Sequence, residues 1–326
     1  MSFTFLKTRF VKALTRAQEP LKSILERSML LDGKLLDKIN GSRSTLPSLN
    51  TAEYQVFSQW GEDGIIAWLV DQLDGIPCSF VEFGVEDYQE SNTRYLLQSR
   101  NWQGLVIDGF QKNINYIRNQ EYYWRNDLTA ICAFIDRNNI NSLFLENGFK
   151  GEVGLLSIDI DGNDFWVWQA IEVVSPVIVV CEYNAVLGDK LSLSVPYKSD
   201  FQRTLEHYSN LYFGASIRAM IRLGLDKGYT FIGTTSSGCN AFFIRNDYAS
   251  RIMSRLERVL MFPSKIREAR DQAGVLKYTS SIERIKIINN LPFIDINSGK
   301  CALLFQHGFL HSNLWADCKP VELKKG

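Results

Sequence analysis

Apolar and polar residues in the middle of the chain form two alternating patterns. Short, nearly continuous apolar runs are typical of buried strands, and they alternate with segments whose apolar residues recur at helical spacing. The runs are SFVEFG (79–84), GLVID (104–108), TAICAFI (129–135), VGLLSIDI (153–160) and PVIVVCEY (176–183). This order predicts an α/β fold in which helices cover both faces of a parallel sheet.

The later part of the pattern predicts the end of this sheet and the limits of the domain. A helix is expected over residues 214–228, followed by an antiparallel hairpin of YTFIG (229–233) and NAFFIR (240–245). We divide the chain into an N-terminal helical segment with its linker (1–50), an α/β domain (51–250) and a C-terminal extension (251–326). Within the extension, SKIREARDQAG (264–274) has a helix-like pattern.

The N-terminal segment predicts two helices, over residues 1–18 and 21–39. The first has four basic residues, no acidic one, and apolar residues at helical spacing: Phe3, Leu6, Phe10, Val11 and Leu14. Three interpretations fit: a helix docked on its own domain or on a dimer partner, a membrane-surface helix attracted to anionic lipid, or a mitochondrial presequence. Residues 1–45 are therefore the expected place of a membrane or partner contact, and a homo-oligomer is compatible with the sequence.

Composition narrows the class of protein. Lysine plus arginine and aspartate plus glutamate both number 36, so there is no basic excess of the kind that nucleic-acid binding requires. The six cysteines lack CxxC spacing, which favours free thiols in a reducing compartment. No apolar run approaches the roughly 18 residues of a membrane span. We expect a cytoplasmic protein that could lie peripherally at the inner face of a membrane.

Carboxylates follow every predicted parallel strand, at the edge of the sheet where such folds bind ligands. The polar residues and the glycine at this edge are Glu82, Gly84, Glu86, Asp87, Asp108, Asp136, Asp159, Asp161, Asn163, Asp164, Glu182 and Asn184. The first loop has one glycine, no GxGxxG or GxxxxGK[ST] motif, and two acids, Glu86 and Asp87, that would repel phosphate. A cationic ligand without phosphate suits it better, and S-adenosylmethionine is such a ligand. Asp108, 24 residues after Gly84, could accept both ribose hydroxyls.

A second group of acids could serve the acceptor. Asp159 and Asp161 are two residues apart, so they point to the same face of an extended chain. With Glu182 and Asn184 they could form an all-oxygen site for Mg²⁺ or Mn²⁺. Without a metal, one of these acids or Asp164 could act as general base, or DGND could simply be a turn that caps the next helix.

One histidine is also a candidate base. His207 is the only histidine of the α/β domain, and its ordinary pKa lies close to neutrality. A lone histidine on a helix is nevertheless more often structural. Both interpretations of His207 remain open from the sequence.

Several segments together resemble a known family. Between residues 57 and 247, FSQWGEDGII, FVEFGVEDYQESNTRYLL, GLVIDG, LLSIDIDGNDFWVW and GCNAFFIR resemble class I S-adenosylmethionine-dependent methyltransferases. More narrowly, they resemble the FkbM-like group associated with polysaccharide and lipopolysaccharide biosynthesis. The resemblance implies a Rossmann-like sheet of seven strands with the last antiparallel. The residues that it and the loop pattern assign to the cofactor are Gln59, Glu62, Glu82, Gly84, Glu86, Asn92, Asp108, Asp136 and Asp159.

The resulting prediction is O-methyl transfer from S-adenosylmethionine to a sugar, a glycan or a related polar hydroxyl. The candidates at the acceptor end are Asp161, Asp164, Glu182, Asn184 and His207. The candidate Mg²⁺ or Mn²⁺ ligands are Asp159, Asp161, Glu182 and Asn184. Two alternatives remain: a non-catalytic scaffold in a glycan-synthesis complex, and a metal-dependent nucleotide-sugar enzyme without methyl transfer.

Overall fold

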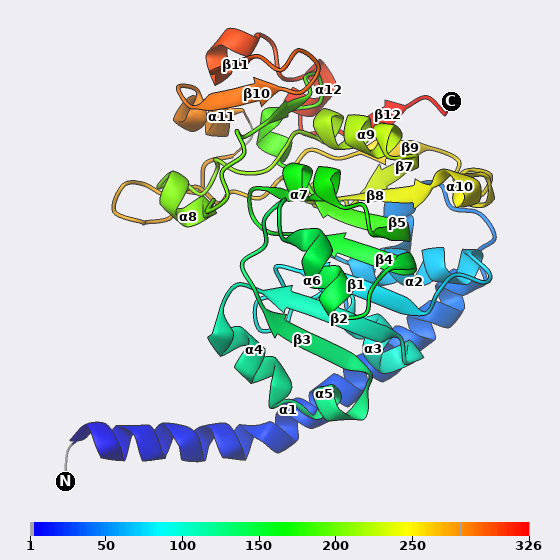
Figure 1. Ribbon diagram of the computed structural model, residues 1–326, viewed down its shortest axis with the longest axis vertical. Coiled ribbons are helices and arrows are strands. Elements are labelled where there is room, and N and C mark those ends of the chain that lie inside the picture. The colour runs from blue at the N-terminus through cyan, green and yellow to red at the C-terminus, as the bar shows by residue number, and fades with distance from the viewer. Residues whose placement is uncertain (1–2, 281, 326) are drawn as a thin grey trace.

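A seven-stranded sheet forms the centre of the protein (Figure 1). The computed structural model describes residues 3–280 and 282–325, with side chains from Leu21 onward. The strand order is β3-β2-β1-β4-β5-β8-β7. The strands are β1 (Ser79–Phe83), β2 (Gln103–Asp108), β3 (Leu128–Cys132), β4 (Gly151–Ile158), β5 (Val174–Glu182), β7 (Tyr229–Thr234) and β8 (Asn240–Arg245).

The first five strands of this sheet run parallel, and β8 runs against its neighbours β5 and β7. The predicted fold class, an α/β fold with a Rossmann-like sheet of seven strands and the last one antiparallel, is confirmed. Because parallel strands point the same way, the carboxyl ends of β1 to β5 lie along one edge. The register pairs Glu182 at the end of β5 with Asn240 at the start of β8.

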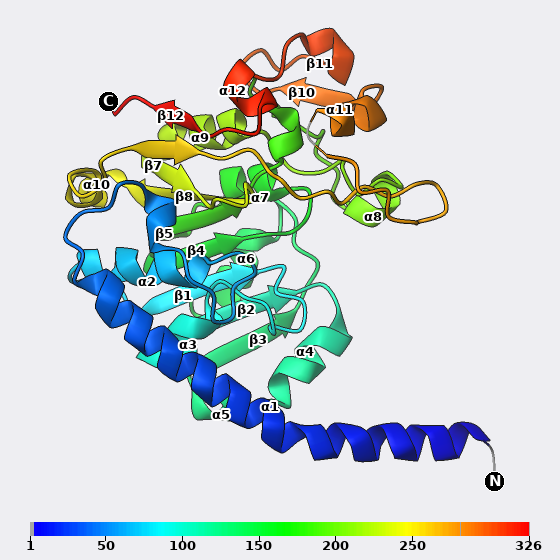
Figure 2. The ribbon, with the colours of Figure 1, turned by 180° about the vertical axis from the view of Figure 1, so that it is seen from behind.

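Helices cover both faces of the sheet (Figures 1 and 2). Side chains alternate along β1, so Val81 and Phe83 pack on one face and Phe80 on the other. The first face is covered by α6 (Ile140–Glu146), α7 (Asp164–Ala170) and α9 (Ile217–Asp226). The second is covered by α2 (Glu62–Gln72), α3 (Arg94–Arg100), α4 (Gln111–Arg118), α5 (Glu121–Arg125) and α10 (Asn246–Met253).

The remaining elements stand outside the main sheet. They include a three-stranded sheet of β11 (Cys301–Leu303), β10 (Pro292–Asp295) and β6 (Leu193–Ser194), and a pair formed by β12 (Val321–Leu323) and β9 (Val259–Met261). The short helices are α8 (Arg203–Glu206), α11 (Glu283–Ile288) and α12 (Asn313–Ala316). The extension after β8 thus pairs with β6, a strand of the long insertion that follows β5.

Two sequence expectations about local structure are wrong. The strand predicted over residues 129–135 ends at Cys132, and residues 264–274 form no helix. In the second case, the guanidinium of Arg284 donates to the carbonyl oxygens of Ser264 (2.7 Å) and Ile266 (2.8 Å), which holds the start of the segment in extended backbone.

The N-terminal segment also differs from the prediction, because one helix, α1 (Phe3–Gly41), replaces the two expected. Its second half crosses the domain beside α2 and α3, and its first half projects past the domain (Figure 2). Among the helices of the described residues, none combines the length and the apolar character that a membrane span requires.

Candidate active site

The loop after β1 passes unusually close to the loop after β4. Gly84 has φ +76°, and a Cβ atom added to it would lie 1.4 Å from the carbonyl oxygen of Asp159. Any side chain at this position would collide with backbone, so only glycine allows the approach. The single glycine of the first loop therefore brings the ends of β1 and β4 together.

The next residues of this loop are set by Glu82, whose carboxylate is buried. It accepts hydrogen bonds from Ser91 Oγ (2.6 Å), Thr93 Oγ1 (2.5 Å) and the Asn92 backbone N–H (2.8 Å). Burial raises the pKa of Glu82, although these donors oppose the shift. Its observed contacts fix the loop before α3, and they leave little of the carboxylate free for a ligand.

Glu86 is the second residue after Gly84 in the same loop. Its φ is +46°, in the left-handed region where glycine is usually found, and its side chain is exposed. Partial burial and the neighbouring Asp161, Asp87 and Asp108 raise the pKa of Glu86. The backbone at Glu86 therefore has the left-handed conformation typical of glycine, and the side chain adds a carboxylate to the sheet edge.

One cavity opens at the ends of β1, β2 and β4, and we call it the β2 cavity. Its volume is about 490 Å³, and its lining includes Asp108, Phe110, Asn113, Phe134 and Ile135. Asp108 Oδ1 accepts from the Phe110 N–H (2.8 Å) and from Asn113 Nδ2 (2.9 Å). Its second oxygen, Oδ2, has no hydrogen-bond donor among the described residues. The aromatic rings of Phe110 and Phe134 are both exposed.

A second cavity, which we call the acidic cavity, lies beside the first and has a volume of about 570 Å³. Seven carboxylates and one basic side chain, Arg203, line it, together with Gln59, Asn92 and Asn240. The two cavities share Gly84, Glu86, Asp87, Asp159, Asp161 and Arg203. They are two parts of one groove, and its second part is strongly negative.

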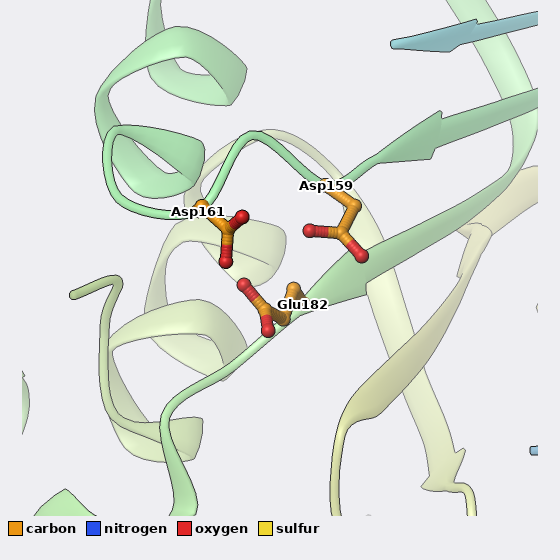
Figure 3. Close-up of side chains that lie close together, drawn as sticks. All are labelled: Asp159, Asp161 and Glu182. Atoms are coloured by element: carbon orange, nitrogen blue, oxygen red, sulfur yellow. The ribbon is translucent and has the colours of Figure 1, made fainter. Parts of the chain in front are cut away.

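Three of these acids face one another across the ends of β4 and β5 (Figure 3). One oxygen each of Asp159, Asp161 and Glu182 lies within 4.8 Å of the others. Asp161 has φ +55°, and the turn it forms brings its carboxylate back toward Glu182. Burial, followed by the charges of the neighbouring acids, raises the pKa of Asp159 and Glu182 well above their ordinary values.

A guanidinium partly balances this acidic group. Arg203 Nη1 donates to Asp161 Oδ1 (2.6 Å), while its Nε donates to the Asn210 carbonyl (2.7 Å). The guanidinium lies 3.9 Å from the ring centre of Phe213. These contacts hold one positive charge beside three carboxylates, a ratio that leaves room for a second cation.

Two buried acceptor atoms of the acidic cavity lack a partner among the described residues. They are Glu182 Oε2 and Asn240 Oδ1, on paired residues of β5 and β8. Asn240 Nδ2 is already bonded to Glu62 Oε1 (2.8 Å). Buried acceptors are costly when unpaired, so these two favour a bound donor or cation.

The structure keeps five sequence candidates out of the groove. Asp164 is buried and accepts from the Ile160 and Gly162 N–H groups (both 2.9 Å), so it closes the turn after β4, and burial raises its pKa to about 6. Asp136 lies beyond the end of β3 and accepts from two backbone N–H groups in the turn before α6. Glu62 accepts from the Trp60 N–H as well as from Asn240, and positions the latter. The other two are Asn184 and His207.

Asn184 and His207 do not join the acidic group. The Asn184 side chain donates to the carbonyls of Leu211 and Phe213 (both 3.0 Å) and accepts from the Val186 N–H, so its polar atoms are used inside the protein. His207 Nδ1 pairs with Ser209 Oγ (2.7 Å), outside the lining of both cavities. Burial lowers the pKa of His207.

Arg203 and Asn240 are the site residues that the sequence analysis missed. Arg203 stands four residues before His207, in a segment that the strand pattern did not place near the sheet edge. The sequence offered one signal for Arg203: a row of acids at the sheet edge with no basic residue assigned to balance their charge. Asn240 is the first residue of the predicted hairpin strand, and only the register with β5 brings it to Glu182.

No protein-family model matches the chain, and no curated protein matches it. Among solved structures, the N-terminal domain of EvdMO1 with S-adenosylhomocysteine bound matches 67% of this chain and 95% of its own, at 12% identity and a TM-score of 0.40. An S-adenosylmethionine-dependent methyltransferase from Mesorhizobium loti matches 57% of this chain and 100% of its own, at 10% identity and a TM-score of 0.36. At this level of similarity, neither match carries an argument about function.

Proposed function

We propose that the chain is an S-adenosylmethionine-dependent O-methyltransferase whose cofactor spans the two cavities. The observation that carries the proposal is the division of the groove at Gly84. On one side, Asp108 offers a carboxylate oxygen with no donor among the described residues, in a cavity that two exposed aromatic rings also line; on the other, seven carboxylates and one arginine line the cavity. A ligand with a nucleoside at one end and positive charge at the other fits both sides.

The nucleoside end would occupy the β2 cavity. A carboxylate at the tip of the second strand can accept both hydroxyls of a ribose, and Asp108 Oδ2 is free to do so. Phe110 and Phe134 offer flat apolar surfaces for an adenine. Phe110 and Asn113 hold the other oxygen of Asp108, which orients the carboxylate before the ligand binds.

The methionine end would enter the acidic cavity, where its ammonium and sulfonium groups meet Glu86, Asp159 and their neighbours. Pyrophosphate ligands are disfavoured at the same place, because phosphates need positive potential and free backbone N–H groups. Two basic side chains line the β2 cavity against five acidic ones, so its lining has an excess of acids. Lys112 lies over the ring of Phe110 (5.8 Å to its centre), and Arg203 is paired with Asp161.

The reaction is an in-line displacement at the methyl carbon. The acceptor oxygen forms a bond to this carbon, the carbon–sulfur bond breaks, and its electron pair stays on sulfur as neutral S-adenosylhomocysteine. The hydroxyl proton passes to a carboxylate, for which Glu182 is the best placed because its Oε2 is buried without a partner among the described residues. Burial raises the pKa of Glu182, which makes its carboxylate a stronger base toward the hydroxyl proton.

The same acids suit a divalent cation. Asp159, Asp161 and Glu182 supply three oxygens of the kind that Mg²⁺ and Mn²⁺ prefer, and Glu182 Oε2 lacks a donor. A bound cation would orient an acceptor diol and lower the pKa of its hydroxyl. Arg203 forms an ion pair with Asp161, so it would compete with the cation for this carboxylate or share the carboxylate with the cation.

A sugar or glycan hydroxyl is the acceptor that we propose, in line with the FkbM-like sequence segments and with a role in surface polysaccharide synthesis. The wide acidic cavity supports a polar acceptor with several hydroxyl groups. Asp161 and Glu182 would accept hydrogen bonds from such a molecule.

A matched pair of variants tests cofactor binding. Asp108→Asn removes the carboxylate charge in the β2 cavity, whereas Asp136→Asn changes a carboxylate with the same local hydrogen bond, to the N–H two residues on, outside the groove. Calorimetry with S-adenosylhomocysteine should show a loss of at least about tenfold for Asp108→Asn, as expected for a lost charged hydrogen bond, and unchanged affinity for Asp136→Asn. Equal affinities in both variants, or no binding to the wild-type chain, would refute the proposal.

A further inference from the structure

The second half of α1 packs on the domain through its polar side. Glu26 forms an ion pair with Arg94 (3.0 Å), and Asp37 accepts from Tyr95 Oη (2.8 Å). Between them Gly33 is buried, and a Cβ atom there would lie 2.8 Å from the Tyr95 ring. The inner face of the helix therefore combines charged residues and a glycine with one apolar side chain, Leu30, that packs beside Tyr95.

The opposite side of the same helix is apolar and turned to solvent. Six of its side chains are more than half exposed: Leu21, Ile24, Leu25, Leu31, Leu35 and Ile39. At 100° per residue, these positions fall on one stripe. An amphipathic helix normally buries its apolar side in its own protein, and α1 does the reverse. An exposed apolar surface of this length indicates a contact site.

Charge indicates what covers this stripe. Arg27, Lys34 and Lys38 lie along one edge of it; all are exposed and have no side-chain partner among the residues whose side chains are described. Asp32, which falls inside the stripe at 100° per residue, is the one exposed acid of α1 between Leu21 and Gly41. Residues 1–18 add four bases and no acid, and Glu19 follows them. The α1 backbone continues through that part and projects past the domain in both views (Figures 1 and 2).

We propose that the outward stripe of α1 docks on an anionic lipid surface, with the helix lying in the plane of the headgroups. Apolar side chains would enter the boundary of the acyl chains, and the flanking bases would meet the lipid phosphates. A second copy of the chain fits less well, because two such faces would bring basic flanks together with too few acids to balance them. This docking does not depend on the proposed methyl transfer.

Vesicle sedimentation of the full chain tests the proposal. Vesicles of phosphatidylglycerol mixed with phosphatidylcholine should carry the protein into the pellet, and pure phosphatidylcholine vesicles should bind at least tenfold less. Raising salt from 0.05 to 0.5 M should weaken the binding, since it screens the basic side chains. Equal binding to both kinds of vesicle would contradict the proposed contact between the basic side chains and anionic lipid.

Two sets of variants, each with a matched control, distinguish vesicle binding through the α1 stripe from binding through other parts of the surface. Ile24→Glu with Leu31→Glu should abolish pelleting, whereas Leu225→Glu, an equally exposed leucine on α9, should not change it. Glutamine at Arg27, Lys34 and Lys38 should weaken binding at least tenfold. Glutamine at the exposed Lys265, Lys286 and Lys300 serves as the control and should not.

Light scattering of the wild-type chain without vesicles decides between the occupants. The proposal predicts a monomer whose melting temperature is unchanged by the α1 substitutions. A dimer that Ile24→Glu and Leu31→Glu dissociate, together with absence of vesicle binding, would assign the stripe to a second copy and overturn the proposal.

Discussion

The α-carbon of Gly84 faces the carbonyl oxygen of Asp159 so closely that a methyl group between them would lie 1.4 Å from that oxygen. This contact joins the loop after β1 to the loop after β4, and both cavities of the groove meet at it. The separation of the nucleoside side from the acidic side therefore depends on one hydrogen atom in place of a side chain.

Gly84→Ala should destabilise the protein and reduce cofactor affinity together. The left-handed φ alone costs an alanine about 1–2 kcal/mol, and the clash with backbone adds to this because neither loop can yield alone. Gly148→Ala is the control, since Gly148 has φ +81° with no atom within 4 Å of the added Cβ. Urea unfolding should show the larger loss for Gly84→Ala, and equal losses in the two variants would contradict the close contact.

Asp164 should make stability depend on pH. Burial raises its folded-state pKa from 3.8 to about 6, so the folded protein favours the protonated form. The stability that the folded protein gains by holding a proton on Asp164 is fully present below about pH 4 and is lost as the pH rises from about 4 to about 6. Asp164→Asn imitates the protonated form, so the stability gap between variant and wild type should shift in favour of the variant by roughly 2–3 kcal/mol across this range.

Urea unfolding at pH 4, 5, 6 and 7 measures this shift. Asp74→Asn is the control, because the Asp74 side chain is exposed at the surface. A gap between Asp164→Asn and wild type that stays constant with pH would contradict a raised folded-state pKa of Asp164 in this range.

The charge of the cofactor should make its binding sensitive to pH. Asp159 and Glu182 have pKa values well above the ordinary 3.8 and 4.5, so they gain protons at a higher pH than free carboxylates do. S-adenosylmethionine carries a sulfonium charge that S-adenosylhomocysteine lacks. Lowering the pH until these two acids take up protons should therefore weaken S-adenosylmethionine binding several-fold more than S-adenosylhomocysteine binding, by analogy with other charge pairs near a surface. Parallel pH profiles for the two ligands in calorimetry would place the sulfonium away from these acids.

Removing Arg203 should strengthen divalent-cation binding. Its guanidinium lies 2.6 Å from Asp161 and competes for the carboxylate. Arg203→Gln should raise Mn²⁺ affinity about fivefold or more, an effect of about 1 kcal/mol for one nearby charge. Arg222→Gln, which removes an arginine from the surface pair with Asp226 (3.0 Å), should leave Mn²⁺ affinity unchanged. Paramagnetic resonance of free Mn²⁺ measures both, and a loss of affinity in Arg203→Gln would mean that the arginine supports the site instead.

The sequence predicted the sheet well because its strands are continuous apolar runs, with a hairpin at the end. It did not predict α4, whose buried apolar residues are only Ile114 and Ile117. The two helices expected at the N-terminus form one, because the helix continues through Pro20.

The row of acids at the sheet edge was predicted, but their roles were harder to separate. Asp108 ends β2 and Asp164 follows β4, yet their contacts differ. Asp108 keeps one oxygen for a ligand, whereas both oxygens of Asp164 accept backbone N–H groups. Sequence spacing does not distinguish these cases, because the difference lies in how the next turn folds back. Arg203 and Asn240 depend on long-range pairing, which a single sequence does not reveal.

The central claim is that the groove accepts a cationic nucleoside without phosphates, and calorimetry on the wild-type chain tests it most directly. S-adenosylmethionine and S-adenosylhomocysteine should each bind at a ratio of one per chain, while NAD⁺ and a uridine-diphosphate sugar should give no heat of binding under the same conditions. Binding of either pyrophosphate ligand, with no binding of S-adenosylmethionine or S-adenosylhomocysteine, would contradict the account.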